Sequence, residues 1–156
     1  MMLNKVAIVD FKDESKEAIK TLNYEWLEKY FHIEEGDVLS LSNPKEYIID
    51  KGGYIFYATL NNEIVGTVSL MKVDNQIFEL GKMAVKNSVQ GYGIGTLLLE
   101  HCLDVSNQKD ISKLIIYSNT QLKSAIHLYE KYGFVETELE SGLYERADVK
   151  MEKYLN

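Results

Sequence analysis

The chain is poor in features that would assign it to several protein classes. Its 156 residues include one cysteine, Cys102, which cannot form a disulfide within the chain or supply a cluster of thiolate ligands. No apolar run approaches the roughly 20 residues that span a bilayer, and residues 1–5 lead into a strand-like segment without the apolar core of a signal peptide. These absences exclude a disulfide scaffold and a zinc ribbon, and they favour a cytoplasmic protein that does not enter a membrane.

Basic charge is also scarce. Seventeen Lys and Arg stand against 24 Asp and Glu, which gives a formal net charge of −7 at pH 7, and no dense basic run occurs. This sign is wrong for binding a phosphate backbone, so nucleic acid is not an expected partner. The three histidines are scattered without the spacing of metal ligands, and we expect no metal.

Apolar sequence, by contrast, is plentiful enough for a packed core. Hydrophobic residues make up 46% of the chain and charged residues 26%, which is the balance of a globular protein. The length suits one compact domain. We therefore expect residues 1–156 to form a single domain in which Cys102, on the buried face of a helix, is a core residue.

The periodicity of the apolar residues predicts helices on either side of a three-stranded meander. Before the meander we expect a strand at 6–9, a helix with Ile19, Leu22, Trp26 and Tyr30 on its core side, an irregular stretch at 37–43, and a short helix from Pro44 to Gly52. The meander strands are 54–60, 63–73 and 76–85, and after them we expect helices at 94–105 and 124–132 and strands at 113–117, 134–138 and 146–154. The strands at 76–85 and 113–117 should lie side by side in parallel, because a helix connects them.

A glycine-rich loop, Gln90-Gly91-Tyr92-Gly93-Ile94-Gly95-Thr96, joins the meander to the next helix. Glycine lets a backbone approach a ligand closely, and the N–H groups of a helix's first turn carry the positive end of its dipole. The loop therefore suits a pyrophosphate, although a tight turn that needs glycine torsions gives the same pattern. A Rossmann loop does not fit because Thr96 stands three residues after Gly93, and a Walker A loop does not fit because no Lys-Ser or Lys-Thr follows.

Two segments together resemble the GNAT superfamily of acetyl-CoA-dependent N-acetyltransferases. The loop matches the pattern Q/R-x-x-G-x-G/A at Gln90, Gly93 and Gly95, and residues 125–134, A-I-H-L-Y-E-K-Y-G-F, are similar to the family's A-I-x-L-Y-E-K-x-G-F. The resemblance covers nearly the whole chain. It implies an α/β fold with a central mixed, mostly antiparallel sheet and helices on both faces.

The resemblance also implies that acetyl-CoA is bound as a co-substrate. The pyrophosphate would lie against the loop, at Gln90, Gly91, Tyr92, Gly93, Ile94, Gly95 and Thr96. Backbone atoms of Met83, Ala84 and Val85 would contact the pantetheine arm where the fourth and fifth strands of such folds separate. Leu122 stands where many members carry an asparagine for this arm, so Asn119, three residues earlier, is the polar candidate.

Two residues are candidates for catalysis by the same resemblance. Tyr129 would donate its phenolic proton to the coenzyme sulfur, whereas its helical spacing alone is also that of a core aromatic. Glu79 would be the general base, directly or through water, or else a structural carboxylate. Strict alternation would put Glu79 on one strand face with Gly81, Met83 and Val85. A backbone N–H near Met83 would stabilise the oxyanion.

The predicted function is transfer of acetyl from acetyl-CoA to a primary amine by direct attack in a ternary complex. The net charge and the acidic residues Glu34, Glu35 and Asp37 would attract a cationic acceptor of either kind, small amine or protein amine. A small amine or amino-acid-like acceptor is favoured over a protein N-terminus or lysine, because aromatic residues around the first helix, Tyr24, Trp26, Tyr30 and Phe31, could close over a compact ligand. We expect these three acidic residues to lie on a solvated loop, and Trp26 and Tyr30 to face the core. The alternative is a coenzyme-binding sensor or interaction domain without turnover, and assembly as a homodimer stays open.

Overall fold

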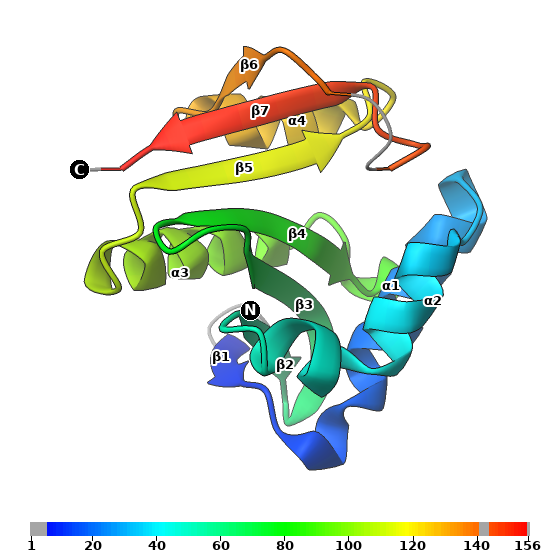
Figure 1. The fold of residues 1–156 in the computed structure, drawn as a ribbon. Coiled ribbons are helices and arrows are strands. Elements are labelled where there is room, and N and C mark those ends of the chain that lie inside the picture. The colour runs from blue at the N-terminus through cyan, green and yellow to red at the C-terminus, as the bar shows by residue number, and fades with distance from the viewer. Residues whose placement is uncertain (1–5, 141–143, 156) are drawn as a thin grey trace.

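The computed structural model describes residues 6–140 and 144–155, which form one twisted seven-stranded sheet with helices on both faces (Figure 1). The strands are β1 (Val6–Asp10), β2 (Tyr54–Leu60), β3 (Glu63–Lys72), β4 (Ile77–Val85), β5 (Lys113–Ser118), β6 (Val135–Thr137) and β7 (Val149–Tyr154). The helices are α1 (Glu17–Tyr30), α2 (Glu35–Ser42), α3 (Ile94–Gln108) and α4 (Lys123–Lys131), with short turns η2 (Asp13–Ser15), η3 (Lys45–Ile49) and η4 (Asn87–Val89).

The sheet is mixed and mostly antiparallel, as predicted from the sequence. Its strands run in the order β1-β2-β3-β4-β5-β7-β6, and among these neighbours only β4 and β5 are parallel. The helical crossover that parallel neighbours require is supplied by α3, which lies between β4 and β5 in the chain. Among the described residues, no helix is both long and apolar enough to cross a bilayer.

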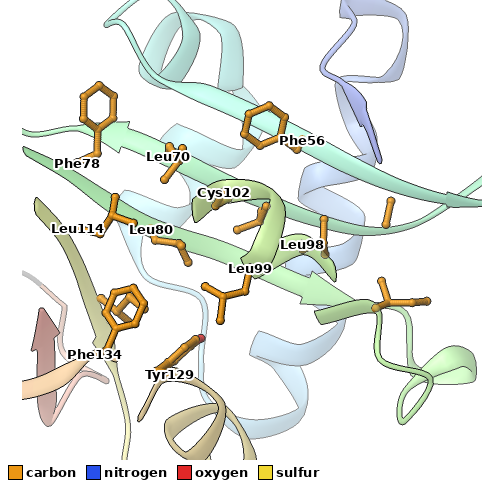
Figure 2. Close-up of a cluster of buried hydrophobic side chains, with 14 of the residues drawn as sticks. Phe56, Leu70, Phe78, Leu80, Leu98, Leu99, Cys102, Leu114, Tyr129 and Phe134 are labelled. Atoms are coloured by element: carbon orange, nitrogen blue, oxygen red, sulfur yellow. The ribbon is translucent and has the colours of Figure 1, made fainter. Parts of the chain in front are cut away.

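Two hydrophobic clusters cover the two faces of the sheet. On one face, Leu98, Leu99 and Cys102 of α3 pack with strand residues such as Phe56 and with Tyr129 and Phe134 (Figure 2). On the other face, residues of α1, α2 and η3 pack against Ile55 and Tyr57 of β2. Successive residues of β2 thus alternate between the two clusters, because strand side chains point to opposite faces. The Cys102 side chain is fully buried, which confirms it as a core residue.

The segment after α1 differs from the prediction. Residues 37–43 were expected to be irregular, but most of them belong to α2, because the Glu34 backbone N–H donates to the Asp37 carboxylate at 2.9 Å and caps the helix start. The helix expected from Pro44 is only the π-type turn η3, in which the Asp50 N–H donates to the Lys45 carbonyl. The sequence E-E-G-D before an apolar run carries the capping signal that the prediction overlooked.

Two further expectations need correction at the edges of elements. Tyr30, expected in the core, is 50% exposed, and the fully buried apolar side chains of α1 include Ile19 and Leu27. The last strand was expected from Arg146, but β7 begins at Val149. Residues 144–148 stay outside the ladder because their polar groups are used elsewhere: Arg146 reaches α2, and the Asp148 carboxylate accepts hydrogen bonds from Thr120.

Candidate active site

A cleft opens where β4 and β5 separate. The two strands pair only at Ile77–Lys113, Phe78–Leu114 and Glu79–Ile115, and β4 then continues to Val85 without β5 beside it. The cleft has a volume of about 530 Å³, within the size range of small-molecule sites. Its walls come from α1, β4, the start of α3, β5, α4 and the segment before β7. The expected separation of the fourth and fifth strands is confirmed.

One end of the cleft is formed by the N-terminus of α3. Gly91 and Gly93 have φ of 86° and 83°, the left-handed region that favours glycine. Gly93 is the N-cap and has no side chain with which to cap, and no described carbonyl or side chain accepts from the N–H groups of Gly95 and Thr96. These donors and the helix dipole make a site for an anion.

Gly95 leaves room at this helix end that the chain itself does not fill. A Cβ built on Gly95 would meet only the Met83 sulfur, at 4.0 Å, so internal packing does not demand a glycine there. The Gln90 side chain donates to the Val85 carbonyl at 3.0 Å and fixes the loop to the end of β4. A phosphate group could therefore approach the α3 N–H donors without displacing protein atoms.

Most residues predicted to bind the coenzyme line this cleft. They are Met83, Ala84, Val85, Gln90, Gly91, Gly93, Ile94, Gly95 and Asn119. The side of the loop that carries Tyr92 and Thr96 does not line the cleft, and Tyr92 is exposed. The Asn119 amide is already engaged, because it donates to the Arg146 carbonyl and accepts from the Gln121 N–H, both at 2.8 Å.

A β-bulge in β4 decides which of its side chains reach the part of the cleft lined by Asp37, Lys82 and Arg146, called the acceptor end below. Thr67 pairs with Ala84 and Ser69 with Gly81, so Lys82 and Met83 together stand opposite Val68. Lys82 has a φ of 53°, and its carbonyl accepts from the buried Asn23 amide at 3.1 Å. The bulge shifts the alternation, so Met83 and Val85 pack toward the α3 cluster while Lys82 lies with Glu79. The expectation that Glu79, Met83 and Val85 share one face is wrong for this reason.

Glu79 lines the cleft and is held by one neutral partner. The Tyr144 hydroxyl donates to Glu79 Oε2 at 2.8 Å. Burial raises the pKa of the Glu79 carboxyl, and this hydrogen bond and the charges of Lys82 and Arg146 only partly oppose the rise. A carboxyl with a raised pKa is a stronger proton acceptor than an exposed one, which suits a general base.

Tyr129 lies on α4 with its ring in the core (Figure 2). It also lines the same cleft as Glu79. Its ring packs edge-on against Phe134, with centroids 6.0 Å apart. The hydroxyl makes no hydrogen bond to any residue of 6–140 or 144–155, and burial raises the pKa of Tyr129 to about 12. The structure thus brings both residues predicted for catalysis to one cleft and leaves the Tyr129 hydroxyl available to a ligand.

An ionic cluster that the sequence did not reveal closes the acceptor end. Arg146 donates from Nη1 and Nη2 to the two oxygens of Asp37, at 2.7 and 2.9 Å, and from Nη1 to Glu34 Oε2 at 3.0 Å. Lys82 Nζ lies 3.4 Å from Asp37 Oδ1. Asp37 is 1% exposed, so the expectation that Glu34 and Asp37 lie on a solvated loop is wrong, and Glu35 alone of the three is exposed.

The cluster should make the fold sensitive to loss of Asp37. Burial opposes ionisation, but the Arg146 and Glu34 hydrogen bonds and the Lys82 charge hold the pKa of Asp37 below its usual value. We expect Asp37→Asn to lower the free energy of unfolding by about 3 kcal/mol in urea, because it leaves the buried Lys82 without its ion-pair partner and Arg146 with Glu34 alone. A lowered pKa means that this stabilisation is present above the usual aspartate pKa of 3.8 and is lost as pH falls through the folded-state pKa.

The exposed neighbour Glu35 provides the control for that variant. Glu35→Gln removes one negative charge two residues away, on the same helix, and should change the unfolding free energy by less than about 0.5 kcal/mol. Equal losses of unfolding free energy in the two variants, or an unchanged fall of stability at acid pH in Asp37→Asn, would show that the cluster does not stabilise the fold.

Among the described residues no group of three His, Cys, Asp or Glu is arranged to hold a metal.

The curated relatives to which this chain is similar include proteins named as N-acetyltransferases. The chain is 28% identical over 101 residues to the uncharacterized N-acetyltransferase YvbK of Bacillus subtilis, covering 63% of this chain and 65% of the relative. It is 25% identical over 119 residues to the ribosomal protein bS18-alanine N-acetyltransferase of Escherichia coli, covering 76% and 80%. The chain spans 43% to 65% of the lengths of the first curated relatives that it matches.

Solved structures share the fold over almost their full length. A GNAT-family acetyltransferase from Staphylococcus aureus superposes with a TM-score of 0.86 at 23% identity, covering 97% of this chain and 99% of that one. The PaiA N-acetyltransferase of Thermoplasma acidophilum, solved in complex with coenzyme A, gives 0.75 at 20% identity, covering 96% and 99%. The Acetyltransferase (GNAT) family profile matches residues 17–134, from α1 through the β4–β5 cleft to the end of α4, and by this match the chain belongs to the GNAT acetyltransferase family.

Proposed function

We propose that this chain transfers acetyl from acetyl-CoA to a primary amine by direct attack within a ternary complex. The observation that carries the proposal is that Glu79 and Tyr129 line one cleft whose far end is the N-terminus of α3. A ligand that places its phosphates at α3 would lie between these two side chains. The likeness to a protein solved with coenzyme A supports this choice of donor.

Each part of the cleft suits one part of the donor. The α3 N–H groups and the space at Gly95 would hold the pyrophosphate. The edge of β4 that β5 leaves unpaired, from Met83 to Val85, would offer backbone groups to the pantetheine amides. Acetyl-CoA supplies the activated thioester, and the chain's own residues orient it and move protons.

The proton transfers fall to the two candidate residues. Glu79 accepts a proton from the acceptor ammonium, directly or through water, so that the neutral amine can attack. A β4 backbone N–H near Met83 donates a hydrogen bond to the developing oxyanion. Tyr129 donates its phenolic proton to the departing sulfur, and its raised pKa, about 12, keeps it protonated until then.

The acceptor end favours a small amine over a polypeptide. Trp26 and Tyr30 of α1 and Phe31, which follows the helix, line it, and Arg146, in the segment before β7, binds Asp37 of α2. This arrangement restricts the open groove that a protein chain would need. The pairing of Glu34 and Asp37 with Arg146 removes most of the negative field expected from these acidic residues, so enclosure supports the choice and charge does not. The Escherichia coli relative is named for a ribosomal protein acceptor, which makes peptides the necessary comparison.

A panel of acceptors tests the proposal. Thiol release from acetyl-CoA is measured with amino acids, polyamines, amino sugars and peptides bearing a free N-terminus or lysine. We expect amine-dependent release that is fastest, by kcat/KM, with a small acceptor. Peptides far above every small amine would overturn the acceptor class, and coenzyme binding without turnover of any amine would favour the sensor alternative.

The pH profile should report Glu79. A general base works only when deprotonated, and the raised pKa of Glu79 places the acid limb of kcat/KM above the usual carboxyl value of 4.5. Activity should therefore rise with pH through that limb, and Glu79→Gln should lower activity and remove the limb. Glu136→Gln, at an exposed strand position, is the control that should keep it. An unchanged acid limb in Glu79→Gln would exclude Glu79 as the base.

A further inference from the structure

Lys82 is a buried cation with donors to spare. Its side chain is 7% exposed, and its one hydrogen bond to the described residues is the 3.4 Å contact with Asp37. Its ammonium also lies over the face of the Tyr144 ring, 5.5 Å from the centroid. An ammonium carries three N–H donors, and a buried charge that lacks partners is costly. Lys82 is therefore equipped to bind one more anionic or polar group.

Asp37 does not satisfy the hydrogen-bonding capacity of the Lys82 ammonium. Both Asp37 oxygens already accept short bonds from Arg146, and Oδ2 also accepts from the Glu34 N–H at 2.9 Å. The Arg146 guanidinium in turn donates its hydrogen bonds to Asp37 and Glu34. The longest and weakest contact in the cluster is thus the one made by Lys82, whose ammonium is the cation left with capacity for a ligand.

The bulge in β4 directs the Lys82 ammonium to the acceptor end of the cleft. A left-handed φ of 53° is uncommon for a lysine and persists here because Asn23, itself buried, binds the Lys82 carbonyl. Lys82 lines the cleft together with Glu79, and the two charges interact. Met83 and Val85 pack toward α3 instead, so Lys82 points to the face of β4 away from the helix end suited to phosphates.

We propose that Lys82 binds a carboxylate of the acceptor, and that the acceptor is an amino acid or a similar compound whose amine and carboxylate lie a few atoms apart. The inference rests on the proposed function and narrows its substrate class. The acceptor amine would lie at Glu79 and its carboxylate at Lys82, with the Tyr144 ring beside both. Each charge of such a zwitterion would then meet an opposite charge in a site shielded from water.

Acceptor pairs that differ only in the carboxylate test this assignment. Each amino acid is compared with its decarboxylated amine, for example phenylalanine with phenethylamine and lysine with cadaverine, in wild type, Lys82→Met, Lys82→Arg and Lys86→Met. Lys86 is the control because it is exposed, pairs with Glu63 and does not line the cleft. Asp37 keeps Arg146 in Lys82→Met, and a thermal unfolding scan checks that each variant is folded.

We expect wild type to prefer the carboxylated member in kcat/KM by roughly 10- to 100-fold, the range of a charge-assisted hydrogen bond. Lys82→Met should bring the preference near one through the acceptor KM, with the KM for acetyl-CoA unchanged, while Lys82→Arg and Lys86→Met should retain it. A preference that survives in Lys82→Met, or an equal rise in the KM for acetyl-CoA, would overturn the inference. Wild type that acetylates amines without a carboxylate preference overturns the inference alone, whereas wild type that acetylates no amine overturns the proposed function as well.

Discussion

Replacing Gly95 with glutamate is expected to abolish coenzyme A binding in a protein that is folded and no less stable. The glutamate would project into the space beside the α3 N–H donors, where we place the pyrophosphate. Bringing like charges together costs several kcal/mol, which corresponds to at least about 100-fold in Kd. Gly95 is helical and a Cβ there meets no close atom, so a better helix former near the positive end of the dipole should add up to about 1 kcal/mol of stability.

Calorimetric titration with coenzyme A and a thermal unfolding scan measure both effects together. Leu97→Glu is the matched control, because it adds the same charge two residues later, on an exposed position of α3 that does not line the cleft. Its coenzyme affinity should stay within a few-fold of wild type. If Gly95→Glu binds coenzyme A as tightly as Leu97→Glu, the N-terminus of α3 does not hold the pyrophosphate.

Replacing Tyr129 with phenylalanine should lower kcat by roughly 10- to 1,000-fold, the contribution of a general acid, and leave the Kd for coenzyme A nearly unchanged. Stability should also be unchanged, because the Tyr129 hydroxyl makes no hydrogen bond to the described residues and its ring packing survives in phenylalanine. If Tyr129 had only a core role, Tyr129→Phe would change neither kcat nor the stability of the fold. The loss of kcat at constant stability is therefore the informative result.

The control is the same chemical change one turn along the chain. Tyr132 donates its hydroxyl to Glu100 at 2.6 Å on the protein surface, so Tyr132→Phe should leave kcat unaltered. Stopped-flow measurement of the chemical step is needed alongside steady-state rates, since slow product release can hide a change in chemistry. A chemical step in Tyr129→Phe as fast as in Tyr132→Phe would remove Tyr129 from the mechanism.

Much of the fold follows from local sequence patterns. Period-two alternation marks β2, β3 and β4, and helical spacing marks α3, because those segments each bury an apolar face. The glycine loop lies between β4 and α3, and Tyr129 lies on α4. The sequence patterns predict these elements in this order. These patterns predict the meander and the parallel pair β4 and β5, whereas the separation of these strands and the site residues Glu79 and Tyr129 were expected only from the resemblance to the GNAT superfamily.

The acceptor end could not be predicted in the same way, because it depends on contacts between distant residues. Arg146 and Asp37 are 109 positions apart, and no sequence pattern around either residue predicts their contact. Without Arg146, the acidic run before α2 has the composition of a solvated loop. The bulge at Lys82 is set by pairing with β3 and by the Asn23 amide, so strict alternation put the wrong side chains beside Glu79.

Direct transfer from acetyl-CoA to an amine is tested most directly by measuring initial rates with both substrates varied, while quantifying free thiol and acetylated amine in the same samples. Direct attack in a ternary complex predicts no thiol release without amine, one acetylated amine per thiol released, and intersecting lines in double-reciprocal plots. Parallel lines together with acetyl retained on the protein would indicate a covalent intermediate and would contradict the account.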